Sequence, residues 1–240
     1  MKLIPLLIMI VFSSFPSAAS AGDTLDRFQD KVTRFTLDNG LTFLVAERHR
    51  APVAGFVTFV DTGGVNEPKG HTGIAHFLEH MAFKGTPRIG VGNREAEKAL
   101  LKKTDRAYAK WLAAKYRTTV YSRQEQKELR KKFESLRNEA NTYVNPNAYA
   151  KILERHGATQ INAVTSKDFT MYFCSLPANR AKLWLSLESA RLTRPVFRQF
   201  YTEKAVVLEE RRKRVDSDPT GRMMEELLAM AGFPGSTSHW

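Results

Sequence analysis

The stretch His71-Thr72-Gly73-Ile74-Ala75-His76-Phe77-Leu78-Glu79-His80-Met81-Ala82-Phe83 decides how this chain folds and where its chemistry lies. It follows a strand-like run that ends at Thr62-Gly63-Gly64. At about 100° per residue, one face of a helix carries four apolar side chains. They are Ile74, Phe77, Leu78 and Met81. We therefore expect an amphipathic helix from about Thr72 to Phe83 whose apolar face docks on a sheet.

The polar side of the same helix carries His76, Glu79 and His80. Two imidazoles at positions i and i+4 converge on one point, as two ligands of a zinc ion must. A carboxylate at i+3 projects beside them, where it can take a proton from a metal-bound water. The pattern H-x-x-E-H therefore predicts a zinc site with Glu79 as catalytic base. A pair of histidines that are exposed, or that are satisfied by other hydrogen-bond partners, is the alternative, because so short a pattern also occurs by chance.

A catalytic zinc site needs a third protein ligand and leaves one position open for water. Glu154 lies 74 residues after His80, and Glu209 and Glu210 lie on a later predicted helix. Glu203 precedes Glu210 by seven residues, which is two helical turns, so both face the same way. That spacing suits a ligand and a carboxylate that supports it. The residues by themselves leave the choice between Glu210 and Glu154 open.

The first 21 residues have the pattern of a secretory signal peptide. A basic start at Met1-Lys2 is followed by an apolar run to Phe15 and by Ala19-Ser20-Ala21, the small residues that a signal peptidase needs. We expect cleavage after Ala21, export to the periplasm or beyond, and no stable membrane anchor. The single cysteine, Cys174, excludes an internal disulfide and is expected to be a buried strand residue.

The formal charge of +12 lies mostly in one stretch, residues 93–140, which holds 14 basic and seven acidic residues. The stretch has no Pro or Gly and predicts one long helix or a helical hairpin that turns near Thr118–Ser122. A solvated helical surface is the favoured interpretation and a polyanion site the weaker one. Nucleic acid is therefore not an expected partner.

The rest of the chain alternates strands and helices. Strands are expected at 31–37 and 41–46, around the hairpin signal Asp38-Asn39-Gly40, and at 53–60, 159–164 and 169–176. Helices are expected at 147–156, 178–192 and 199–215. The order predicts an α+β fold, with a sheet covered by helices on one face.

Three blocks of this sequence resemble the insulinase/pitrilysin family of zinc peptidases. The first runs from Gly63-Gly64-Val65-Asn66-Glu67-Pro68 through the histidine helix to Lys84-Gly85-Thr86-Pro87. The second is Gly157-Ala158-Thr159-Gln160-Ile161-Asn162-Ala163-Val164-Thr165-Ser166-Lys167-Asp168, and the third is Glu203-Lys204-Ala205-Val206-Val207-Leu208-Glu209-Glu210-Arg211. The blocks come in the family's order and cover most of residues 31–222.

The resemblance implies a role for each matching residue. His76, His80 and Glu210 would bind one Zn²⁺, Glu79 would be the catalytic base, and Glu203 would support a ligand without touching the metal. It also favours Glu210 over Glu154, because the family has no ligand before its Asn-Ala strand. Asn162 and Ala163 would bind substrate on an edge strand to which a peptide adds as an extra strand. The implied fold is a mixed or antiparallel sheet of the pitrilysin and mitochondrial-processing-peptidase kind, and the basic stretch 93–140 would be a helical insertion.

Family members continue beyond the loop that Phe233-Pro234-Gly235-Ser236 resembles, and a second lobe of similar fold follows. Residues 22–240 are therefore expected to form the N-terminal, zinc-bearing domain, an incomplete lobe. The predicted function is zinc-dependent hydrolysis of peptides or small unfolded proteins, with a second lobe or a homologous partner subunit. The alternative is a non-catalytic peptide-binding fragment or partner subunit.

Overall fold

The computed structural model describes residues 29, 31–68 and 70–231. The predicted signal peptide 1–21 lies outside the described residues. The described residues fall into two compact units, one that ends at Ala51 and one that begins at Pro52.

The first unit holds an antiparallel hairpin of β1 (Val32–Thr36) and β2 (Thr42–Ala46). Its turn closes where the sequence predicts: the Gly40 amide donates to the carbonyl of Leu37, and the Leu37 amide donates to that of Leu41. Phe35 and Phe43 stack across the strands with ring centroids 5.0 Å apart, which supports the register.

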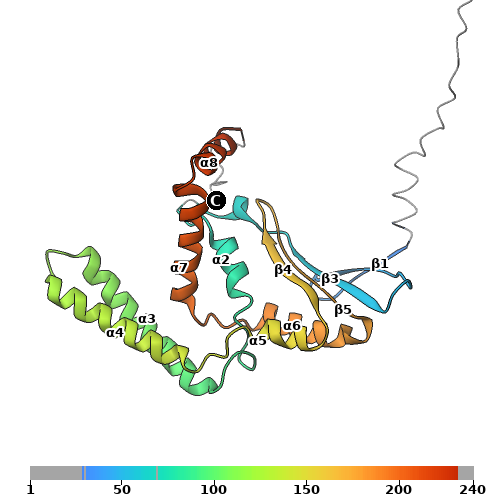
Figure 1. Ribbon diagram of the computed structural model, residues 1–240, viewed down its shortest axis with the longest axis horizontal. Coiled ribbons are helices and arrows are strands. Elements are labelled where there is room, and N and C mark those ends of the chain that lie inside the picture. Colours follow the sequence, from blue (N-terminus) through green and yellow to red (C-terminus); the bar gives the residue numbers. More distant parts are fainter. Residues whose placement is uncertain (1–28, 30, 69, 232–240) are drawn as a thin grey trace, which may run out of the picture. The chain divides into compact units, whose positions relative to one another are not determined.

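The second unit is built on a three-stranded antiparallel sheet in the order β3 (Val53–Val60), β5 (Thr170–Pro177), β4 (Thr159–Thr165). Helices α5 (Ala148–Arg155) and α6 (Ala181–Thr193) cover one face of it (Figure 1). The core there consists of Tyr149, Leu153, Cys174, Leu176 and Leu187. The predicted α+β fold and the burial of Cys174 are confirmed. On the other face, the β3 side chains Val53, Val57 and Phe59 are exposed.

The helix that carries the histidines is α2 (Ile74–Met81), shorter than predicted. Its start is set by the buried carboxylate of Glu67, which accepts from the amides of Gly73 (2.7 Å) and Ala75 (2.6 Å). A carboxylate is favoured there because the first amides of a helix have no partner within it and carry partial positive charge.

The expected docking of the whole apolar face of α2 on the sheet is wrong. Met81 is buried, but Ile74 and Leu78 are 49% and 47% exposed. Phe77 packs edge-on against Phe200 of α7 (Phe200–Arg211), with ring centroids 4.9 Å apart. The sequence pattern identifies an apolar face but not the element that covers it, and here α7 takes part of that face (Figure 1).

The basic stretch forms a helical hairpin, as predicted, of α3 (Arg94–Tyr116) and α4 (Arg123–Asn141). Asn93 caps α3, and Ser122 with Glu125 forms a capping box on α4. After α7 the chain makes a π-helical turn, Arg212–Asp216, and ends its described part in α8 (Pro219–Ala231). Short 3₁₀ turns lie at Gly64–Asn66 and Ala178–Arg180. Within the described residues no helix is both long and apolar enough to cross a bilayer.

Arg198 joins the loop after α2 to the base of the hairpin. Its side chain is 1% exposed and makes two hydrogen bonds to the carboxylate of Glu97 on α3, at 2.7 and 3.0 Å. The same guanidinium donates to the carbonyls of Lys84, Thr86 and Ile89. The loop can approach it because Gly85 adopts φ 95°, and a Cβ there would lie 2.3 Å from the Ile89 carbonyl oxygen.

Candidate metal centre

His76, His80 and Glu210 converge on one point between α2 and α7. One ligand atom from each lies within 4.8 Å of the others. Glu210 Oε2 is 3.8 Å from His76 Nε2 and 3.7 Å from His80 Nε2. The side chains are between 14% and 24% exposed, so a ligand in their midst would still reach solvent. The sequence places the two histidines together, and the packing of α7 beside α2 brings the carboxylate (Figure 1).

This donor set fits a zinc ion. Two imidazole nitrogens and one carboxylate oxygen form a set that catalytic zinc sites use, with an open fourth position. Bond lengths of about 2.0–2.2 Å in a tetrahedral arrangement place ligand atoms about 3.3–3.6 Å apart. The separations from Glu210 are 3.7 and 3.8 Å, and all three ligand atoms lie within 4.8 Å of one another, so side-chain rotations of up to about an ångström would close the set around an ion.

The second oxygen of Glu210 has its own partner. Arg214, four residues further on, forms an ion pair with Glu210 in which Nη2 lies 2.6 Å from Oε1. The arginine therefore leaves Oε2 directed at the histidines, so the carboxylate is prepared to offer one oxygen. Glu154, the alternative ligand at the sequence level, lies exposed on α5 and is not part of the cluster.

Glu203 lies behind His80, on the side away from Glu210. Its Oε2 is 3.4 Å from His80 Nδ1, and its Oε1 pairs with Lys84. The hydrogen bond to Glu203 raises the pKa of His80, and the pKa of Glu203 is lowered by His80 and then by Lys84. A carboxylate at Nδ1 holds the ring so that Nε2 faces the cluster. The pKa of His76 is lowered, mainly by burial and then by His80.

Glu79 projects from α2 toward β4. Its Oε2 accepts a hydrogen bond of 2.5 Å from the hydroxyl of Thr165 at the end of that strand. Tyr172 of β5 is the partner of Ala163 in the sheet. The pKa of Tyr172 rises to about 12, mainly because the residue is buried, and the negative charge of Glu79 also raises it. The hydrogen bond from Thr165 thus holds the carboxylate of Glu79, the residue that precedes His80 in the sequence.

Asn162 and Ala163 lie on β4, which is an edge strand of the described sheet. Asn162 is exposed, and its Oδ1 accepts from the Ala163 amide at 2.9 Å. Gln160, two residues earlier, has φ 55°, and the register shifts between Thr159 and Asn162. β4 is therefore irregular near its start. Its outer edge belongs to the same strand as Thr165, which holds Glu79.

Sequence reasoning missed four residues that shape this site. Glu67 starts α2, Lys84 neutralises Glu203, Thr165 holds Glu79 and Arg214 holds Glu210. Arg214 offers a sequence signal, since it follows Glu210 by four residues on one helix. The contacts of Lys84 and Thr165 join residues 119 and 86 positions apart, and no local pattern announces them.

Known proteins resemble this chain in sequence and in fold. The sequence profile described as "Insulinase (Peptidase family M16)" matches residues 42–138 and 135–238. The beta subunit of the mitochondrial-processing peptidase of Blastocladiella emersonii is 36% identical over 81 residues, 34% of this chain and 17% of that protein. The zinc protease PqqE of Helicobacter pylori is 27% identical over 193 residues, 78% of this chain and 30% of that protein.

Among solved structures, the crystal structure of a protease from Helicobacter pylori superposes with a TM-score of 0.57 at 23% identity. The superposition covers 83% of this chain and 35% of that one, and it shows a shared fold. The chain thus spans about a third or less of the length of these relatives.

Proposed function

Because the chain belongs to the insulinase/pitrilysin family, peptidase family M16, we propose that it is the zinc-bearing part of a metallopeptidase that hydrolyses peptides or small unfolded proteins. The observation that carries the proposal is the convergence of His76, His80 and Glu210 on one point, with Glu79 held beside it. These residues come from helices about 130 positions apart in the sequence, and their donor atoms suit one Zn²⁺.

Each side chain then has a distinct task. His76, His80 and Glu210 hold the metal, and Glu203 with Lys84 orients His80 from behind. Zinc, when bound, lowers the pKa of a water and polarises the carbonyl that is attacked. Glu79 accepts the proton of the attacking water on its carboxylate and passes it to the departing amine. Thr165 keeps the Glu79 carboxylate in place during both transfers.

Substrate would bind to β4 in an extended conformation. The strand edge at Asn162 and Ala163 offers main-chain donors and acceptors to a peptide, which adds as a further strand. Main-chain pairing gives affinity without a sequence requirement, so selectivity would come from side-chain pockets around the site. This arrangement favours peptides and unfolded segments over folded substrates.

We also propose a cellular location, an insertion and a partner for this domain. The pattern of residues 1–21 supports export to the periplasm or secretion. The α3–α4 hairpin is proposed as an insertion at about 93–140, on the resemblance of the blocks that flank it to the family. The small share of each relative that the chain covers supports a requirement for a second lobe or a homologous subunit.

The test combines zinc content with peptide hydrolysis by the purified chain, alone and mixed with a candidate second lobe. We expect one zinc per chain, lost in His76→Ala and in Glu210→Gln. Glu79→Gln should keep the metal and lose hydrolysis, by a factor of about 10²–10⁴. Glu209→Gln is the matched control, since Glu209 is adjacent in sequence but pairs with Arg212 at the surface.

The outcomes separate this proposal from its alternative. Stoichiometric zinc in Glu210→Gln, or undiminished hydrolysis in Glu79→Gln, would contradict the assignment. Zinc binding without cleavage under any pairing would favour a non-catalytic peptide-binding fragment or partner subunit. That reading draws on the same short coverage of the relatives and predicts that peptides bind at β4 without being cut.

A further inference from the structure

The outer half of the α3–α4 hairpin is basic throughout. Residues 106–124 contain five basic side chains and no acidic one, namely Arg106, Lys110, Lys115, Arg117 and Arg123. In the described part of the chain none of these five forms an ion pair, whereas Arg130 nearer the base pairs with Glu134. Five uncompensated cations on one end of a hairpin repel one another, so their concentration there does not stabilise the fold.

Two apolar side chains project from the same end. Tyr116 is 74% exposed and Val120 is 68% exposed, and they are the two large apolar residues that the described hairpin 94–141 exposes. Tyr116 is the last residue of α3 and Val120 lies in the connection to α4, at the end of the hairpin distant from α2 and α7 (Figure 1). Lys115 and Arg117 flank Tyr116, and Arg123 follows Val120 by three residues. The tip is therefore an apolar pair flanked by three cations, with a single carboxylate, that of Glu125, bound to the Ser122 amide.

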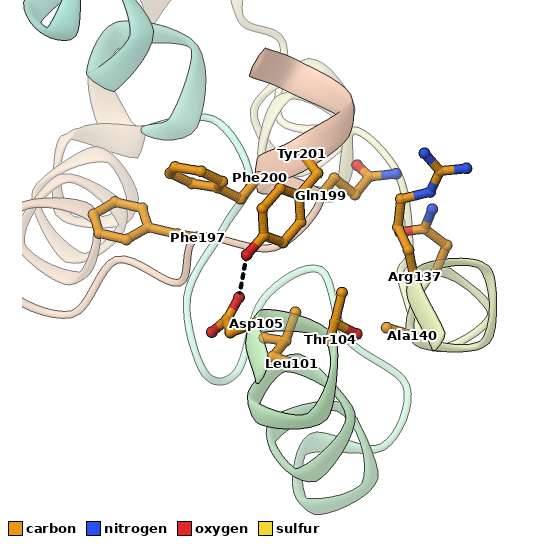
Figure 2. Close-up of a pocket in the computed structure, with 10 residues that line it drawn as sticks. Leu101, Thr104, Asp105, Arg137, Ala140, Phe197, Gln199, Phe200 and Tyr201 are labelled. Atoms are coloured by element: carbon orange, nitrogen blue, oxygen red, sulfur yellow. Dashed lines mark hydrogen bonds between the residues drawn. The ribbon is translucent and has the colours of Figure 1, made fainter. Parts of the chain in front are cut away.

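The side of the hairpin that faces α7, in contrast, is firmly packed. Tyr201 at the start of α7 donates to Asp105 at 2.9 Å (Figure 2), and its ring centroid lies 4.3 Å from that of Tyr108. Trp111 stacks on Phe133 across the two helices, with centroids 5.8 Å apart. These aromatic residues pack the hairpin against α7, and Tyr201 also lines a cavity of about 170 Å³ together with Phe197 and Phe200. Packing against α7 thus accounts for the aromatic residues on this side of the hairpin but not for Tyr116 and Val120.

We propose that this tip, residues 115–123, docks the protein on a bilayer surface rich in anionic phospholipid. In the docked protein the basic side chains lie at the level of the lipid phosphates, and each one raises the partition coefficient of the protein onto the membrane about fivefold. Tyrosine suits the interface because its ring is apolar and its hydroxyl is polar, and Val120 adds apolar area to be buried. A soluble polyanion would need the cations alone. The pairing of cations with exposed apolar residues at one tip therefore favours the membrane surface.

The test is co-sedimentation of the full chain with vesicles. Vesicles of phosphatidylcholine alone are compared with vesicles that also contain phosphatidylglycerol, at low and high salt. Binding is expected to depend on the anionic lipid and to weaken as salt rises. Every variant carries the same apolar residues 3–15, so differences among variants report the hairpin.

Variants of the tip locate the effect. Lys115→Ala/Arg117→Ala/Arg123→Ala is expected to lower the anionic-lipid-dependent partition coefficient about a hundredfold. Lys151→Ala/Arg155→Ala/Lys182→Ala removes the same charge from exposed positions outside the hairpin and should change it less than about fivefold. Tyr116→Ser/Val120→Ser keeps every charge and should lower it about tenfold. Circular dichroism and thermal unfolding establish that each variant is folded.

Equal losses in the two triple variants would overturn the proposal, since net charge alone would then explain binding. Vesicle binding that does not depend on the anionic lipid would also overturn the proposal. Tight, salt-sensitive binding to heparin or DNA that is unchanged in Tyr116→Ser/Val120→Ser, with no preference for vesicles, would assign the tip to a soluble polyanion instead.

Discussion

Replacing Arg198 with methionine is expected to destabilise the fold strongly, because it leaves a buried carboxylate without its partner. All five N–H groups of the Arg198 guanidinium are used, two on Glu97 and three on the carbonyls of Lys84, Thr86 and Ile89. Arg198 and Glu97 are 1% and 4% exposed. Removing one member of such a buried pair costs about 3–5 kcal/mol, and we expect about 4 kcal/mol for Arg198→Met.

The magnitude can be divided by a double-mutant cycle. Glu97→Met alone should cost about 3 kcal/mol, because the arginine keeps its three carbonyl partners but loses its counter-charge. The double variant removes both charges, so it should be less destabilised than the sum of the single variants by about 2–3 kcal/mol. That difference measures the cost of leaving one charge buried and alone.

The measurement is chemical denaturation followed by circular dichroism, accepted where the slope m is unchanged among variants. Arg130→Met is the matched control: it removes the same group from an exposed pair with Glu134 and should cost less than about 0.5 kcal/mol. A loss below about 1 kcal/mol in Arg198→Met, or strict additivity in the cycle, would refute the reasoning that Arg198 and Glu97 are a buried, coupled pair.

Three further predictions concern single side chains. Thr165→Val should lower kcat for peptide hydrolysis about tenfold and leave the zinc content unchanged, because the hydroxyl that holds Glu79 is lost. Thr165→Ser keeps a hydroxyl and should restore kcat. An equal loss of kcat in both variants would contradict the role of the hydroxyl. Burial raises the pKa of Cys174, so iodoacetamide at neutral pH should label it only after unfolding, and rapid labelling of native protein would contradict its placement. Gly221→Ala places a Cβ 1.9 Å from the Arg214 carbonyl oxygen and should cost about 2 kcal/mol or more in thermal unfolding. Gly55→Ala, with no atom within 4 Å, should be neutral or slightly stabilising, so equal effects at the two glycines would disprove the close contact.

Much of the local structure follows from patterns within single segments. The β1–β2 turn, the strands and the two basic helices lie within a few residues of their predicted positions, because turn residues, caps and periodicity act over short distances. The start of α2 is the exception. It lies only two residues from its predicted position, but its cause is not local, because Glu67, six and eight residues before the amides it binds, supplies the cap from outside the helix.

The sequence by itself determined that His76 and His80 face one point with Glu79 beside them, since a helical period of 3.6 residues allows no other outcome. Which carboxylate completes the cluster was not determined by spacing: Glu154 and Glu210 were both available, and the packing of α7 on α2 brings Glu210. The support of the site by Thr165 and Lys84, and the burial of Arg198, are likewise products of tertiary structure. The physical reason is range: helix geometry relates residues within one or two turns, whereas contacts across 86 to 119 positions exist only once separate elements have packed.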